Sequence, residues 1–122
     1  MIKILLIEDD LVMARLYEKI FTYEGFEMLI SADGESGISS AKKDKPTIIL
    51  LDLMMPKMDG LKVLEVLKHD PETKEIPVLI LTNLGNETII SQSYGLGACG
   101  YLLKSEVGTD KIVDEVRKYI KE

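Results

Sequence analysis

Residues 2–10 read Ile-Lys-Ile-Leu-Leu-Ile-Glu-Asp-Asp, so an almost unbroken apolar run ends in three acidic residues. Such a run is typical of a strand that is buried on both faces of a parallel sheet. Three further apolar runs also end at a polar residue. If all four are parallel strands of one sheet, these polar residues gather at its carboxyl-terminal edge, where open α/β sheets bind ligands. The further runs are Ile48–Leu51 before Asp52, Val78–Leu81 before Thr82, and Tyr101–Leu103 before Lys104.

Helical patterns alternate with strand patterns along the whole chain. Five such units predict the α/β class, with a doubly wound, five-stranded parallel sheet and helices on both faces. We expect one domain to account for residues 1–122. The predicted strands are Ile2–Ile7, Phe26–Ile30, Thr47–Leu51, Pro77–Leu81 and Ala98–Leu103. The predicted helices run from Asp10 to Gly25 (inner stripe Met13, Leu16, Tyr17 and Ile20), over Glu35–Lys43, from an Asp59 cap to Asp70, over Glu87–Tyr94 and over Asp110–Lys121.

The composition is that of an ordinary globular domain, with 46% hydrophobic and 30% charged residues. Fifteen basic and 21 acidic residues give a net charge of −6, which argues against direct contact of this domain with nucleic acid. The single Cys99 excludes an internal disulfide, fits a reducing compartment and is expected in the core, while the lone His69 is expected to be exposed. With a strand starting beside Met1 and no apolar stretch of about 20 residues, we expect a cytoplasmic domain without signal peptide or membrane contact.

Three carboxylates are predicted to lie close together. In the common doubly wound order 2-1-3-4-5, the first and third strands are neighbours about 4.8 Å apart, which brings Glu8 and Asp9 next to Asp52. Like charges repel and raise one another's pKa unless a cation compensates them, and oxygen ligands of this kind suit Mg²⁺. We expect Asp9, Asp52 and the backbone carbonyl of Met54 to bind the ion directly, and Glu8 to act through water.

Asp52 is the better nucleophile among these acids. The fourth and fifth strands bring Thr82 and Lys104 to its other side, whereas the neighbours of Asp9 are acidic. A carboxylate can attack phosphorus when a metal and cationic groups neutralise the transferred phosphoryl oxygens. A hydroxyl and an ammonium group suit those oxygens. The set therefore predicts a phosphoryl-transfer site, with Asp52 as acceptor and with Thr82 and Lys104 beside the phosphoryl group.

The same residues lie in four motifs of the chain. They are Ile4-Leu5-Leu6-Ile7-Glu8-Asp9-Asp10, Leu51-Asp52-Leu53-Met54-Met55-Pro56-Lys57-Met58-Asp59-Gly60, the single Thr82, and Gly100-Tyr101-Leu102-Leu103-Lys104. In this order and spacing the chain resembles the receiver domain of bacterial two-component response regulators, over essentially residues 1–122. The resemblance, and not the spacing, supplies the strand order, because the chemotaxis member of the family is a standard example of it.

The resemblance implies a signalling switch that catalyses its own phosphorylation and dephosphorylation, and not a turnover enzyme. A histidine kinase or phosphotransfer protein would donate a phosphoryl group to Asp52, with Mg²⁺ required. Thr82 would then bind the phosphate and Tyr101 would move inward, which changes the face formed by the fourth helix, fifth strand and fifth helix. That face would control a downstream effector protein or an output domain that this sequence lacks. Whether the domain works alone or belongs to a longer regulator stays open.

The chain departs from the family pattern beside two of the site residues. Ser105 follows Lys104, where the family usually has a proline with a cis peptide bond. A cis bond before a non-proline residue costs about 2.5–4 kcal/mol, so we predict a trans Lys104–Ser105 bond and an altered loop. Asn83 follows Thr82, where a small residue is usual.

Two apolar residues flank the expected path of water to the phosphoryl group. Met54 stands two residues after Asp52, and Leu84 stands two residues after Thr82. Neither side chain can orient an attacking water molecule. We therefore predict a long-lived phosphoryl form.

Three alternative functions fit the sequence less well than the switch. A Mg²⁺ enzyme of the dehalogenase type also uses an aspartate nucleophile, but its signature has a second aspartate where this chain has Met54. A nucleotide- or flavin-binding domain needs a glycine-rich first turn, whereas residues 8–11 (Glu-Asp-Asp-Leu) would repel a phosphate. A degenerate receiver that serves only as a scaffold would lack part of the site, and the set is complete here.

Overall fold

The computed structural model describes residues 1–120, which form a five-stranded parallel sheet with helices between the strands. The strand order is β2-β1-β3-β4-β5, and each neighbouring pair is parallel. The predicted fold class and strand order are therefore confirmed. The elements are β1 (Lys3–Ile7), α1 (Leu11–Tyr23), β2 (Glu27–Ser31), α2 (Gly34–Asp44), β3 (Ile48–Leu51), α3 (Gly60–His69), β4 (Val78–Thr82), α4 (Glu87–Gly95), β5 (Gly100–Leu103) and α5 (Ile112–Arg117).

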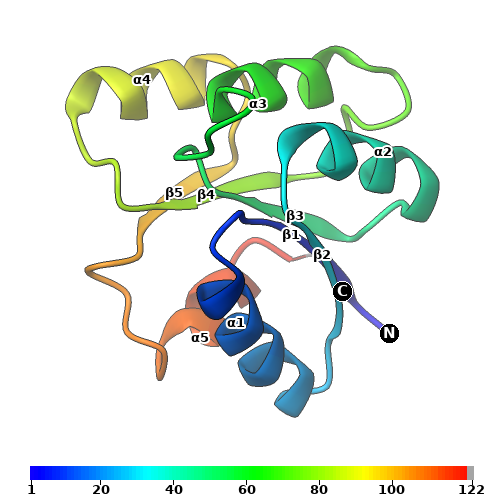
Figure 1. The fold of residues 1–122 in the computed structure, drawn as a ribbon, viewed down its shortest axis with the longest axis vertical. Helices are drawn as coiled ribbons and strands as arrows, with labels where there is room; N and C mark the ends of the chain where they lie inside the picture. The colour runs from blue at the N-terminus through cyan, green and yellow to red at the C-terminus, as the bar shows by residue number, and fades with distance from the viewer. Residues whose placement is uncertain (121–122) are drawn as a thin grey trace.

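The helices cover both faces of the sheet (Figure 1). Helices α1 and α5 lie on one face, and α2, α3 and α4 lie on the other. Because side chains alternate along a strand, Ile4 and Leu6 of β1 pack with α1 and α5, whereas Leu5 and Ile7 pack with α2 and α3. All four are at most 1% exposed, as expected for a central strand with helices on both sides.

Local signals place the ends of α1 and the start of α3 where the sequence predicted them. The Asp10 carboxylate accepts hydrogen bonds from the N–H groups of Val12 and Met13 and so caps α1. Gly25, at a φ of +94°, follows the end of α1 in the left-handed region that favours glycine. The Asp59 carboxylate likewise accepts from the N–H of Leu61 at the start of α3.

Two predictions about individual side chains were wrong. Leu16 is 40% exposed, and the buried residues of α1 are Ala14, Tyr17 and Phe21. Of the predicted stripe, Tyr17 is buried and Met13 and Ile20 are partly buried against the core. Cys99 is exposed, since β5 begins only at Gly100 and the buried Ala98 takes the inward position beside it.

The last helix is also shorter than predicted. Instead of spanning Asp110–Lys121, α5 covers Ile112–Arg117, and Lys121 lies outside the described residues. The helix starts after Lys111 without a side-chain cap, and a turn in which the N–H of Lys111 donates to the carbonyl of Gly108 precedes it. After Arg117 the chain tightens into i→i−3 hydrogen bonds, a common way for a helix to end. Within residues 1–120, none of the helices has the length and apolar character needed to cross a membrane.

Candidate functional site

The predicted site residues do meet at the carboxyl-terminal edge of the sheet. Glu8 follows β1, Asp52 follows β3, Thr82 ends β4 and Lys104 follows β5. Glu8, Asp52 and Thr82 are 1%, 5% and 0% exposed, respectively. The N–H of Asp52 still donates to the carbonyl of Ile7 (3.1 Å), so the acid is held by the ladder between β1 and β3. The sheet therefore fixes the position of its side chain.

Three hydrogen bonds hold the Asp52 carboxylate. Its Oδ1 accepts from the N–H of Met54 (3.0 Å) and from the hydroxyl of Thr82 (2.7 Å), and its Oδ2 accepts from the Lys104 ammonium (3.0 Å). Burial acts to raise the pKa of Asp52, but these hydrogen bonds outweigh it and hold the pKa below its ordinary value of 3.8. The group is therefore an ionised carboxylate at neutral pH.

Glu8 lies on the other side of the same lysine. The Lys104 ammonium bonds Glu8 Oε1, and the N–H of Asp10 donates to Glu8 Oε2 (3.2 Å). Burial raises the pKa of Glu8 to about 7, although the bond from Lys104 opposes the shift and nearby Asp52 adds to it. Burial alone would lower the pKa of Lys104, but its two carboxylate partners raise it. The sequence placed Lys104 only beside Asp52, so its contact with Glu8 was not predicted.

The acidic cluster fits a divalent cation. One carboxylate oxygen each from Glu8, Asp9 and Asp52 lies within 4.8 Å of the others. Among residues 1–120, Lys104 is the cation that bonds these acids, so three carboxylates face one ammonium group. Oxygen donors with excess negative charge suit Mg²⁺. That Glu8 acts through water, and that the Met54 carbonyl is a ligand, stay predictions.

The raised pKa of Glu8 predicts how the metal-free protein responds to pH. Between its ordinary value of 4.5 and about 7, the unfolded chain has lost the Glu8 proton while the folded protein keeps it. The free energy of unfolding should therefore fall as pH rises through this interval, by about 3 kcal/mol at most. The lowered pKa of Asp52 has the opposite sign, and that contribution is lost only as pH falls below 3.8.

Glu8→Gln should remove this loss, because the amide carries no charge at any of these pH values. We expect the variant to exceed the native protein by about 1–3 kcal/mol at pH 8 in EDTA, with the difference shrinking toward pH 4.5. Urea denaturation at pH 5 and pH 8 measures both proteins. Glu27→Gln, which changes an exposed glutamate, is the control. Equal stabilities at pH 8 would show that the buried, ionised Glu8 does not lower the free energy of unfolding.

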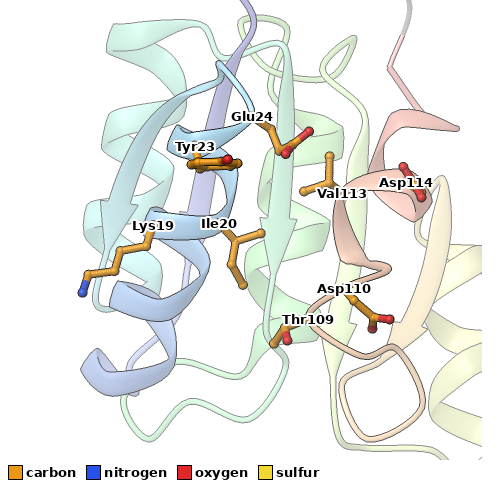
Figure 2. A pocket seen from close by; sticks show the side chains of 8 residues that line it. All are labelled: Lys19, Ile20, Tyr23, Glu24, Thr109, Asp110, Val113 and Asp114. Carbon is orange, nitrogen blue, oxygen red and sulfur yellow. The ribbon is translucent and has the colours of Figure 1, made fainter.

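A groove on the surface of the molecule lies apart from these residues. It has a volume of about 460 Å³ and lies between α1 and the start of α5 (Figure 2). Ile20, Tyr23 and Val113 give it apolar walls, and none of the acids and bases at the sheet edge lines it. The chemistry of the sheet edge is therefore separate from this groove.

Comparisons with known proteins place the chain in a family. A family model described as the response regulator receiver domain matches residues 4–117. The sporulation initiation phosphotransferase F of Bacillus subtilis is 33% identical over 118 residues, which cover 97% of this chain and 93% of that protein. The response regulator PleD of Caulobacter vibrioides is 40% identical over 102 residues, or 84% of this chain, but these are only 22% of PleD.

Solved structures agree with the sequence relatives. The Mn²⁺-bound form of the response regulator Rcp1 superposes with a TM-score of 0.85 at 33% identity, covering 98% of this chain and 94% of that one. The phosphorylated cyanobacterial phytochrome response regulator RcpA gives 0.81 at 31% identity, covering 96% and 89%. With the family model matching nearly the whole chain, this protein belongs to the receiver domains of two-component response regulators, which act in signal transduction.

Proposed function

We propose that this domain is a switch that accepts a phosphoryl group on Asp52 from a histidine kinase or a phosphotransfer protein. The observation that carries the proposal is the buried Asp52 carboxylate, which accepts hydrogen bonds from the Thr82 hydroxyl and the Lys104 ammonium. In the transfer, an Asp52 oxygen bonds to phosphorus as the bond from phosphorus to the donor histidine breaks, which gives an aspartyl-phosphate. The catalytic groups serve the domain's own phosphorylation, so we do not propose a turnover enzyme.

Each neighbour of Asp52 has a role in this step. The Lys104 ammonium and the Thr82 hydroxyl, which both bond Asp52 in this structure, would bind the transferred phosphoryl oxygens. Glu8, Asp9 and Asp52, with the carbonyl of Met54, would hold Mg²⁺, which when bound supplies positive charge to those oxygens. The Mn²⁺-bound structure of the relative Rcp1 supports a divalent ion in this family.

The output of the switch would be a change in protein binding. The Tyr101 hydroxyl donates to the carbonyl of Leu84, which lies two residues after Thr82. Tyr101 is therefore bonded to the segment that follows the other proposed switch residue, Thr82. Movement of Thr82 toward a new phosphate would disturb that bond, let Tyr101 move inward and change the face formed by α4, β5 and α5. The partner would be an effector protein or an output domain of a longer chain, in the cytoplasm. No contact of this domain with nucleic acid or membrane is needed.

Phosphoryl uptake tests the proposal. The protein is incubated with acetyl phosphate, with Mg²⁺ or with EDTA, and its intact mass is measured. We expect one added phosphoryl group with Mg²⁺ and none with EDTA. Absence of the adduct together with absence of Mg²⁺ binding by calorimetry would leave the domain as a scaffold, and the proposal would be wrong.

The phosphoryl group should also be lost slowly. Met54 is 53% exposed and half-buried Leu84 lies on the opposite segment, and neither offers a polar atom from its side chain to water. We expect Met54→Asn to raise the hydrolysis rate by about tenfold, because an amide can position the attacking water. The decay of the adduct after removal of acetyl phosphate measures the rate, and Met54→Leu is the control. Complete loss within seconds from the native protein would contradict the prediction.

A further inference from the structure

The backbone of Lys104 is held from both sides by residues at the end of β4. Its own N–H donates to the carbonyl of Thr82 (2.8 Å), and the N–H of Ser105 donates to the Oδ1 atom of Asn83 (3.0 Å). The first bond continues the pairing of β4 with β5. The second is different, because the acceptor is a side chain and the donor exists only because residue 105 is not a proline.

These two hydrogen bonds restrain the backbone at Lys104. The N–H of Lys104 belongs to the peptide plane before its Cα, and the N–H of Ser105 belongs to the plane after it. When both planes are held, the two backbone dihedrals of Lys104 are restrained, and with them the direction in which its side chain leaves the chain. That side chain ends between Asp52 and Glu8, so its direction decides whether the ammonium reaches Asp52.

Neighbouring contacts cannot replace the Asn83 side chain. The Tyr101 hydroxyl bonds the carbonyl of Leu84, and the Leu103 side chain lies against Gly85, but both contacts restrain β5 before Lys104. Ser105 and the residues that follow it begin a turn, with the N–H of Glu106 bonded to the carbonyl of Leu103. Of these contacts, only the bond to Asn83 holds the plane after Lys104 against β4.

We propose that Asn83 is a positioning residue that aims Lys104 at Asp52 through the Ser105 N–H. The inference rests on the proposed function, in which Lys104 binds the transferred phosphoryl group. It gives a role to a carboxamide that bonds the Ser105 N–H and lies outside the proposed set of phosphoryl-binding and metal-binding residues. It also explains how this chain orders the lysine without a proline after it.

Phosphorylation kinetics in a double-mutant cycle test the role. We expect Asn83→Ala to slow phosphoryl uptake from acetyl phosphate by about threefold to tenfold, the range of one hydrogen bond. Asn83→Asp keeps an Oδ1 acceptor and should recover at least half of the lost rate. In a Lys104→Ala background, Asn83→Ala should change the rate by less than twofold. Asn86→Ser, which alters the other asparagine of this loop and keeps a cap for α4, is the matched control.

A second readout does not depend on phosphorylation. In the unphosphorylated protein, Asn83→Ala should reduce protection of the Ser105 amide from hydrogen exchange by about threefold to tenfold and shift the NMR signals of the Lys104 side chain toward those of an exposed lysine. Unchanged Lys104 signals, or an equal loss of rate with and without Lys104, would overturn the proposal. A native protein that takes up no phosphoryl group would defeat the proposed function, while these NMR results would still decide how Asn83 acts on Lys104.

Discussion

Asp52→Asn is expected to abolish phosphoryl uptake from acetyl phosphate. The amide keeps an oxygen that can accept hydrogen bonds from the Met54 N–H and the Thr82 hydroxyl, so we expect the surrounding loop to keep its conformation. It has no nucleophilic oxygen that can form an acyl phosphate, and its NH₂ group would face the Lys104 ammonium. The native protein should gain one phosphoryl group by intact mass, and the variant should gain none.

The matched control for this loss is Asp59→Asn. Asp59 lies in the same loop and caps α3 through the N–H of Leu61, a role that asparagine also fills well. This variant should take up the phosphoryl group as the native protein does. If Asp52→Asn took up the phosphoryl group at the native level, another acid would be the acceptor, and Asp9 would be the first to test. Loss of uptake in both variants would instead indicate that the loop had been disturbed.

The fold was largely predictable because its signals are local. Each central strand is a short apolar run, and the helices α1 and α3 begin at an aspartate that does cap them. The strand order was not local information and came from the resemblance to receiver domains. Predictions failed where burial depends on a partner distant in sequence, as for Leu16, whose exposure is set by how α1 lies on the sheet. The prediction of the length of α5 was wrong for a different reason, since residues 108–111 form a turn that the helical pattern does not reveal.

The candidate site was predictable as a set, and its internal contacts were not. Parallel strands bring their ends together whatever the loops do, so Glu8, Asp52, Thr82 and Lys104 had to be neighbours once the order was known. Which acid Lys104 bonds depends on side-chain reach: β3 and β4 separate β1 from β5, and the lysine spans them to touch Glu8 as well as Asp52. Two departures from the family pattern, Asn83 and Ser105, indicated that this part of the site is unusual, but only the structure shows that the two residues are hydrogen-bonded.

The largest loss of stability is expected from Gly60→Ala, at the first residue of α3. A Cβ there would lie 2.4 Å from the Cα of Leu53, 2.9 Å from its side chain and 3.0 Å from the carbonyl oxygen of Asp52. The closest of these atoms is backbone, so no rotation of a side chain relieves the overlap. Either α3 or the loop after β3 must move, and we expect a loss of about 3 kcal/mol or more. Urea denaturation measures the change.

Gly95→Ala separates this overlap from the general effect of replacing a glycine. Gly95 ends α4, and nothing lies within 4 Å of a Cβ built on it, so alanine there should be neutral or stabilising by up to about 1 kcal/mol. Equal stabilities of the two variants would mean that the loop after β3 can move to accommodate the Cβ without lowering the free energy of unfolding. A large difference would bear on function too, because the same loop carries Asp52 and Met54. Gly60→Ala should then slow phosphoryl uptake even in the folded fraction, since the atoms that it displaces belong to Asp52, the proposed nucleophile, and to Leu53 next to it.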